Sequence, residues 1–279
     1  MTLIVNRIVT GDCLEVLARL PDACVDLIVF SPPYDDLRAY EGGWSVDSRR
    51  LGEELLRVTK DGGIAAVVLG DATKKFAKSL TTFRWAVDWV DRVGWRLFEC
   101  CIYARHGRPG PWWRTRFRVD HEYIMLFLKG ERPRRFDKQA LRVPTKLSGR
   151  VFRTPGKPAG GRRGRSHRPT LVGPLKCRGT VWHYAASTSE GNRLKLRHPA
   201  TFPDKLAEDL IRCFSVPGDL VLDPMCGSGT TPVMAARHRR RYLGVDVSRT
   251  YTAICRKRLR HELSRGLPTC PGRKRGSTV

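Results

Sequence analysis

The chain has 279 residues and a formal charge of +25, with 52 Lys and Arg against 27 Asp and Glu. This length supports one sizeable core, which we expect to be an α/β domain with an inserted or appended region. The sequence has no apolar stretch long enough to span a bilayer, no signal-peptide pattern and no C-x-x-C pair among nine cysteines, so we expect a cytoplasmic protein with no membrane contact and no metal site.

The first 130 residues alternate short β-branched runs with helical patterns, which is typical of a largely parallel sheet covered on both faces. Asp61-Gly62-Gly63 is typical of a turn into the third strand. The predicted strands are Arg7–Val9, Val25–Phe30, Ile64–Leu69, Arg96–Tyr103 and Tyr123–Leu128. The predicted helices are Leu14–Leu20, Leu51–Val58 and Thr81–Val93.

The pattern changes between residues 131 and 197, where prolines, glycines and arginines replace any sustained period. This segment holds 18 Lys and Arg against 3 acids, and residues 237–279 hold 13 against 2. Two basic segments on a nearly neutral body favour a polyanion-binding surface over a merely solvated charge run. Residues 131–197 are either a mobile linker or a binding region, and we favour the second because three apolar runs within them can pack: 151–152, 171–172 and 181–184.

Regular structure returns at Phe202-Pro203, which begins a helix with an apolar stripe through Leu206, Leu210 and Phe214. A βαβα unit follows. Its predicted elements are strand Leu220–Leu222, helix Thr230–Arg237, strand Tyr242–Val245 and helix Arg249–Leu263.

The most informative motif is Ser31-Pro32-Pro33-Tyr34, directly after the strand Val25–Phe30. A strand that ends in two prolines cannot continue its ladder, so its last carbonyls point into open space beside an aromatic ring. The exocyclic amine of cytosine or adenine is a poor nucleophile. Hydrogen-bond acceptors such as the Ser31 hydroxyl and the Pro32 carbonyl can bind its N–H groups and aim its lone pair at a methyl group. Tyr34 can stack on the base. A loop that merely ends a strand is the alternative interpretation.

A second motif, Asp223-Pro224-Met225-Cys226-Gly227-Ser228-Gly229-Thr230-Thr231, follows the strand Leu220–Leu222. Its glycines allow a sharp turn and close approach to a ligand, and Asp246 ends the next strand, where an acid can bind both ribose hydroxyls. The loop lacks a P-loop lysine, and Asp223 would repel a phosphate but attract a sulfonium. S-adenosylmethionine therefore suits the loop better than ATP or NAD. An ordinary strand-to-helix turn is the alternative.

Together these residues resemble the amino-methylating DNA methyltransferases, and specifically the β-class arrangement, in which the catalytic motif precedes the cofactor loop. Segment 31–34 matches the catalytic motif, 55–63 is similar to the helix and turn that follow it, and 223–231 matches the cofactor loop. The resemblance implies a Rossmann-like S-adenosylmethionine-dependent methyltransferase fold of the α/β class with an inserted target-recognition region. The implied parts are a catalytic half (1–130), the recognition region (131–197), a cofactor-binding half (198–265) and a basic tail (266–279).

The resemblance also implies roles for single residues. Asp12 would lie near the adenine of the cofactor and Asp246 near its ribose. The segment 198–205, which includes Phe202 and Lys205, would close over the cofactor. The remaining cofactor contacts would come from Asp223, Pro224, Met225, Cys226, Gly227, Ser228, Gly229 and Thr230.

A Ser at the first position of the catalytic motif usually accompanies N4-cytosine methylation in this family, whereas Asp accompanies N6-adenine methylation. Cytosine is therefore favoured. C5 methylation would need a Pro-Cys nucleophile, which the sequence lacks, so we expect direct transfer without a covalent enzyme intermediate. A base in a duplex must first be flipped out.

Asp71 is a candidate proton acceptor or orienting group, although it could equally cap a helix. Trp112 and Trp113, next to Arg114, suit an extruded base or a phosphate backbone, and packing under a loop is the alternative. In the recognition region the candidate DNA contacts are Arg162, Arg163, Arg165 and Arg168, which could read guanine or hold phosphates.

The expected partner is double-stranded DNA in a prokaryotic nucleoid. The sequence leaves open a cognate restriction endonuclease, and either a monomer or a homodimer. Three alternatives stay open: N6-adenine methylation with the same site, methylation of RNA, and an inactive methyltransferase-like nucleic-acid-binding protein.

Overall fold

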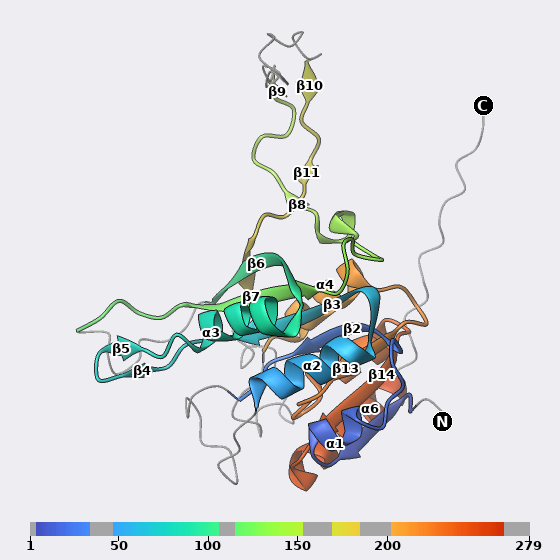
Figure 1. The fold of residues 1–279 in the computed structure, drawn as a ribbon. Coiled ribbons are helices and arrows are strands. Elements are labelled where there is room, and N and C mark those ends of the chain that lie inside the picture. Colours follow the sequence, from blue (N-terminus) through green and yellow to red (C-terminus); the bar gives the residue numbers. More distant parts are fainter. Residues whose placement is uncertain (1–3, 34–46, 106–114, 153–168, 185–201, 265–279) are drawn as a thin grey trace. The chain divides into compact units, whose positions relative to one another are not determined.

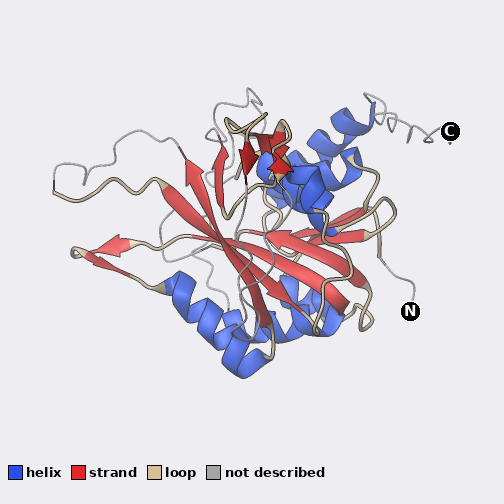
Figure 2. Cartoon of the chain, turned by 90° about the horizontal axis from the view of Figure 1, so that it is seen from above, coloured by secondary structure: helices blue, strands red, loops and turns tan. Residues whose placement is uncertain are grey.

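The computed structural model describes residues 4–33, 47–105, 115–152, 169–184 and 202–264. The chain divides into two compact units. One comprises Met1–Phe136 with Thr180–Val279, and the other comprises Asp137–Gly179. The larger unit contains an eight-stranded sheet. Helices cover both faces of this sheet (Figures 1 and 2). The predicted α/β class is therefore confirmed.

The sheet of the larger unit has the order β1-β14-β13-β2-β3-β7-β6-β12. Its strands are β1 (Arg7–Thr10), β2 (Val25–Phe30), β3 (Thr59–Leu69), β6 (Arg96–Arg105), β7 (His121–Leu128), β12 (Val181–Tyr184), β13 (Leu220–Asp223) and β14 (Arg241–Asp246). All run in the same direction except β7, which is antiparallel to both β3 and β6. The central strand β2 is buried along its whole length, including Asp26, the one charged residue in its otherwise apolar run.

Two helical layers cover this sheet. One contains α1 (Cys13–Leu17), α2 (Ser48–Val58) and α3 (Thr81–Asp88), which continues as the π-helical turn η1 (Trp89–Val93). The other contains α4 (Asp204–Phe214), α5 (Thr230–Arg237) and α6 (Arg249–Ser264). Each predicted helix is present, with ends that differ by a few residues.

Strand β3 begins earlier than its sequence predicts, because the expected turn at Asp61-Gly62-Gly63 is a bulge inside the strand. The register with β2 jumps from Val25 opposite Thr59 to Leu27 opposite Ile64. Gly62 has a φ of +72°, donates to Lys129 O at 2.8 Å and accepts from Arg134 N at 2.8 Å. Gly62 has the left-handed backbone that the sequence predicts for a turn, but its hydrogen bonds to Lys129 and Arg134 keep this segment in the sheet.

The segment Val181–Tyr184 packs as predicted, but it does so as a strand of the main sheet. It forms β12, parallel to β6, with Trp182 and Tyr184 buried. The Tyr184 hydroxyl donates to the buried Asp209 carboxylate at 2.8 Å. The predicted recognition segment 131–197 therefore includes a strand of the larger unit.

The smaller unit, Asp137–Gly179, contains a 3-10 turn and two short antiparallel strand pairs in its described residues. Its elements are η2 (Lys138–Leu141), β8 (Val143–Pro144), β9 (Val151–Phe152), β10 (Thr170–Leu171) and β11 (Leu175–Lys176). Val151, Phe152 and Leu171 are exposed. The prediction that these residues pack was wrong, because the described residues of this unit pair their backbones as two-residue strands and form no second layer over the side chains.

A short hairpin, β4 (Thr73–Lys74) and β5 (Ala77–Lys78), follows β3 and was not predicted. Among the described helices, none is long and apolar enough to cross a membrane.

A cluster of tryptophans joins α2 to α3. Trp89 is completely buried, stacks between Trp85 and Trp95 with centroid distances of 5.7 and 5.8 Å, and donates its indole N–H to Ser48 O at 2.9 Å. Ser48 begins α2, the first described element after the catalytic motif. The cluster therefore holds the start of α2 against the core.

We expect Trp89→Ala to lower the free energy of unfolding by about 3–5 kcal/mol, because it removes a buried aromatic side chain and leaves a cavity. Trp89→Phe should lose less, since it keeps a ring but not the N–H donor. Denaturant titrations at an unchanged m-value measure both. A loss below about 1 kcal/mol for Trp89→Ala would contradict the role given to this cluster.

Candidate active site

The two predicted motifs leave the sheet from neighbouring parallel strands. In the register of β2 and β13, Leu27 lies opposite Val221 and Ile28 opposite Leu222. The chain goes from β13 toward β14 but from β2 toward β3, so the strand order reverses between these two strands. Ligands of open α/β sheets bind at the carboxyl ends of the strands at such a reversal. The Thr231 hydroxyl of the second motif donates to Val29 O at 3.0 Å, in β2 two residues before Ser31.

The catalytic motif begins one residue after β2 ends. Ser31 and Pro33 are half-buried, and Pro32 is buried. Within the described part of the chain the Ser31 hydroxyl has no hydrogen-bond partner, so it can accept a bond from a substrate. Tyr34 lies outside the described residues.

The cofactor loop turns so tightly that only glycine fits at Gly229. Its φ is +88°, and a Cβ there would lie far inside van der Waals contact with Cys255 Sγ of α6. Gly227 also has a positive φ, of +48°. Two left-handed positions within three residues let the chain pass from β13 into α5 with its backbone open to a ligand.

Asp223, at the mouth of this loop, is only 2 % exposed. It accepts from Met225 N at 3.0 Å. Burial raises the pKa of Asp223 to about 8, and the nearby Asp246 adds to the rise. The Asp223 carboxyl is therefore neutral at pH 7 in the free protein. A cation that binds next to it would favour its ionised form.

Asp246 and Asp12 complete a row of acids along the same edge. Asp246 ends β14 and accepts from Gly227 N at 2.8 Å and from Ser248 N at 2.9 Å, and burial raises its pKa. Asp12 follows β1 and accepts from Leu14 N at 2.8 Å as the N-cap of α1. Asp12, Asp223 and Asp246 thus come from three adjacent strands. A row of carboxyl groups beside a glycine turn suits a cationic nucleoside and opposes a phosphate.

Phe202 and Lys205 stand at the start of α4. Phe202 is half-buried. Lys205 donates to the buried carboxylate of Asp209, one turn along the same helix, and pairs with Glu208 at 3.2 Å. Lys205 therefore has an ion-pair role within α4, whereas its contact with a cofactor stays a prediction.

Sequence reasoning missed Arg258 of α6, which supports the cofactor loop from below. Arg258 is 3 % exposed, donates to Ser228 O at 2.9 Å and pairs with Asp204 at 3.2 Å. It shares one helix face with the buried Cys255 and Leu259. That spacing was the available signal that Arg258 faces inward.

The second basic segment, 237–279, contributes several arginines to the body of the larger unit. Arg237 pairs with Glu262 at 2.6 Å, and Arg240 donates to Ser215 O at 2.7 Å. Arg256 donates to Ile8 O at 2.8 Å. These three arginines therefore have structural partners in the body of the larger unit, whereas a polyanion-binding role for this segment stays a prediction.

Asp71 lies just past β3, on the edge that carries Ser31. Its Oδ1 accepts from Thr82 N at 2.9 Å, in the first turn of α3. The capping interpretation is therefore confirmed, and a role in proton transfer stays a prediction. The predicted DNA contacts Trp112, Trp113, Arg114, Arg162, Arg163, Arg165 and Arg168 lie outside the described residues.

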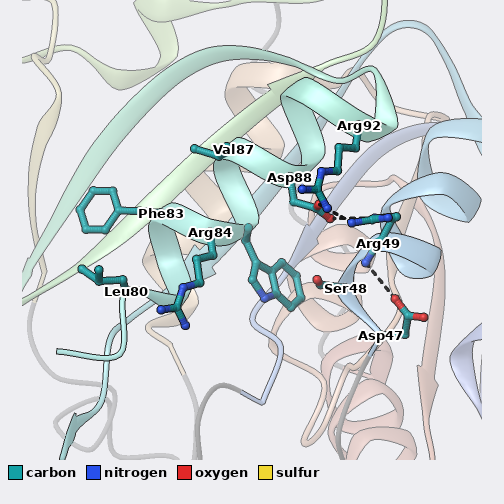
Figure 3. Close-up of a pocket in the computed structure, with 10 residues that line it drawn as sticks. Asp47, Ser48, Arg49, Leu80, Phe83, Arg84, Val87, Asp88 and Arg92 are labelled. Carbon is teal, nitrogen blue, oxygen red and sulfur yellow. Dashed lines mark hydrogen bonds and ion pairs between the residues drawn. The ribbon is translucent and has the colours of Figure 1, made fainter.

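A cavity of about 720 Å³ lies between α2 and α3 (Figure 3). Its lining includes Arg49 and Arg84 beside the apolar Phe83 and Val87. The Arg49 guanidinium bonds the Asp88 carboxylate at 2.9 Å and ties the start of α2 to α3. No residue of the cofactor loop lines this cavity.

Comparison with known proteins agrees with this geometry. The DNA methylase family model, which covers N6 and N4 methyltransferases, matches residues 25–257. The chain belongs to this family. It is a DNA amino-methyltransferase that uses S-adenosylmethionine.

The methyltransferase is similar to the orphan methyltransferase M.BamHII of Bacillus amyloliquefaciens, with 35% identity over 87% of this chain and 91% of the relative. It is 29% identical to the type II methyltransferase M.PvuII of Proteus hauseri, over 87% of this chain and 80% of that protein.

Two solved structures share the fold. The cytosine-N4-specific PvuII DNA methyltransferase has a TM-score of 0.70 at 25% identity and covers 92% of this chain and 87% of its own. A Thermus thermophilus protein described as a DNA modification methylase, complexed with S-adenosyl-L-methionine, has a TM-score of 0.61 at 26% identity and covers 92% and 93%. Asp12, Asp223, Asp246 and the glycine turn are the residues of the methyltransferase that fit this cofactor.

We expect Gly229→Ala to weaken S-adenosylmethionine binding by about tenfold or more, since the new Cβ must displace α6 or the loop. Gly218→Ala is a matched control, because Gly218 has a φ of +90° but open space around it. Calorimetric titration should show weaker binding for Gly229→Ala alone. Equal affinities in the two variants would mean that the close approach to Cys255 does not shape the loop.

The raised pKa of Asp223 predicts a pH dependence of stability in the free protein. Between about pH 4 and 8 the folded state keeps a proton that the unfolded chain releases, so the free energy of unfolding should fall as pH rises through this window. Asp223→Asn, which cannot titrate, should flatten that fall. Denaturant titrations at several pH values measure the two slopes, and parallel curves would refute the assignment.

Proposed function

We propose that this methyltransferase transfers the methyl group of S-adenosylmethionine to the exocyclic N4 amine of a flipped cytosine in duplex DNA. The observation that supports the proposal is the pairing of β2 with β13, because β2 leads directly into residues 31–33 of the Ser-Pro-Pro-Tyr motif and β13 leads into the cofactor loop. The cytosine-N4-specific activity of the structurally similar PvuII enzyme supports the choice of base.

The residues of the catalytic motif orient the amine. The Ser31 hydroxyl and the Pro32 carbonyl accept its two N–H groups and turn its lone pair outward, while Tyr34 stacks on the base. The bound cofactor supplies an electrophilic methyl group. A bond from the amine nitrogen to this methyl forms as the sulfonium–methyl bond breaks, and the amine releases one proton.

Asp71 is the proposed acceptor or orienting group for that proton. Its Oδ1 already accepts from Thr82 N, so its other oxygen carries this role. For DNA binding we propose that Trp112, Trp113 and Arg114 contact the extruded base. Residues 131–197 recognise the DNA sequence, and the arginines that contact guanine or phosphates are Arg162, Arg163, Arg165 and Arg168.

Mass spectrometry of nucleosides from host DNA after expression tests the base. We expect N4-methylcytosine with the parent protein and a loss of about tenfold or more with Ser31→Ala, because one of two acceptors is gone. Ser264→Ala, at the exposed end of α6, is the control and should match the parent.

N6-methyladenine in place of N4-methylcytosine would refute the cytosine assignment and leave the amino-methyltransferase site intact. Long-read sequencing of the same DNA maps the recognised sequence.

A further inference from the structure

The β4–β5 hairpin has a sequence that does not suit its own turn. Thr73 pairs with Lys78 and Lys74 with Ala77, so the turn consists of Lys75 and Phe76 alone. Both are left-handed, with φ of +47° and +63°. Two-residue turns of this kind strongly prefer Asn-Gly or Asp-Gly, because a Cβ is unfavourable at each position.

The side chains at this turn are those that a nucleic acid attracts. Phe76 is 60 % exposed, and the hairpin carries Lys74, Lys75 and Lys78 with no acid between residues 72 and 79. An exposed aromatic ring at the tip of a basic hairpin contributes little to the core. A strained turn that adds little to the core is a feature that occurs at functional sites.

The hairpin is firmly rooted at the catalytic edge. It follows β3, the neighbour of β2, and at its base Ser79 and Ala72 exchange two hydrogen bonds of 3.1 Å. The backbone of Phe76 is held from the other side, where the Arg116 guanidinium donates to its carbonyl oxygen. Figure 1 shows the hairpin projecting away from the sheet beside the segment that leads into β7.

That segment and the hairpin enclose a cavity of about 850 Å³ on the same edge. Phe76 and Lys78 line it together with Asp71, Arg116 and Phe117, of which Phe117 is fully exposed. Two exposed aromatic rings flanked by cations therefore lie on the side of β3 away from the cofactor loop.

We propose that the β4–β5 hairpin is a DNA wedge, in which Phe76 enters the base stack beside the target nucleotide and the hairpin lysines hold the adjacent phosphates. The inference rests on the proposed function, because extrusion of a base leaves a gap in the stack. Apolar side chains that insert between base steps keep such a gap open and offset part of the unstacking cost. The positive charge and the position at the catalytic edge favour duplex DNA over a protein partner.

Phe76→Ala tests the wedge with two duplexes that carry the recognised sequence. In one the target base is paired, and in the other it lies opposite an abasic site and is already unstacked. Single-turnover methylation by Phe76→Ala should slow about tenfold or more on the paired duplex and stay near the parental rate on the abasic one. Phe76→Leu, which keeps an apolar wedge, should restore most of the rate.

Val216→Ala, an exposed apolar truncation just before β13, is the control and should leave both rates unchanged. S-adenosylmethionine affinity and the free energy of unfolding should not differ between Phe76→Ala and the parent, because the ring is exposed.

Lys75→Gly separates a functional from a structural role of the turn. It relieves one left-handed position, so we expect a higher melting temperature together with weaker DNA binding. Equal slowing of Phe76→Ala on both duplexes, or no slowing on either, would overturn the wedge and leave the proposed function standing. Failure of the parent to methylate either duplex would overturn the proposed function and the wedge with it.

Discussion

The active site depends on one strand pairing, that of β2 with β13, between segments at opposite ends of the chain. A buried acid secures its start, where Asp26 accepts from Leu220 N at 2.9 Å and pairs with Lys60 at 2.7 Å. The Thr231 hydroxyl secures its far end by a bond to Val29 O. Backbone ladders fix relative position more firmly than surface contacts do, so the two motifs are held to one edge before any ligand binds.

Burial gives the two kinds of charge in this protein different roles. Acids gather at the carboxyl ends of β1, β13 and β14, where desolvation raises the pKa of Asp223 and Asp246. Several arginines of the C-terminal segment instead bond to backbone carbonyls and carboxylates of the body. The site is thereby prepared for a cation, although the chain as a whole is strongly basic.

The edge that carries the catalytic motif also carries two of the left-handed backbone segments of the larger unit. Gly227 and Gly229 are left-handed in the cofactor loop, and Lys75 and Phe76 are left-handed at the tip of the hairpin. Gly227 and Gly229 adopt this conformation without steric cost, because glycine has no Cβ. Lys75 and Phe76 are held in it by the hydrogen bonds of the hairpin and by Arg116. Strained backbone of this second kind is common in functional regions.

The sequence by itself determined the α/β class, the main helices and strands, and both motifs, because alternating periods, proline pairs and glycine turns are local signals. It did not reveal β12, the β4–β5 hairpin or the inward direction of Arg258. An edge strand of four residues is stabilised by its partner β6, and a buried guanidinium is stabilised by Ser228 and Asp204. Only the tertiary structure decides these three features, because each depends on contacts between residues far apart in the chain. The free energies of such contacts cannot be inferred from a local sequence pattern.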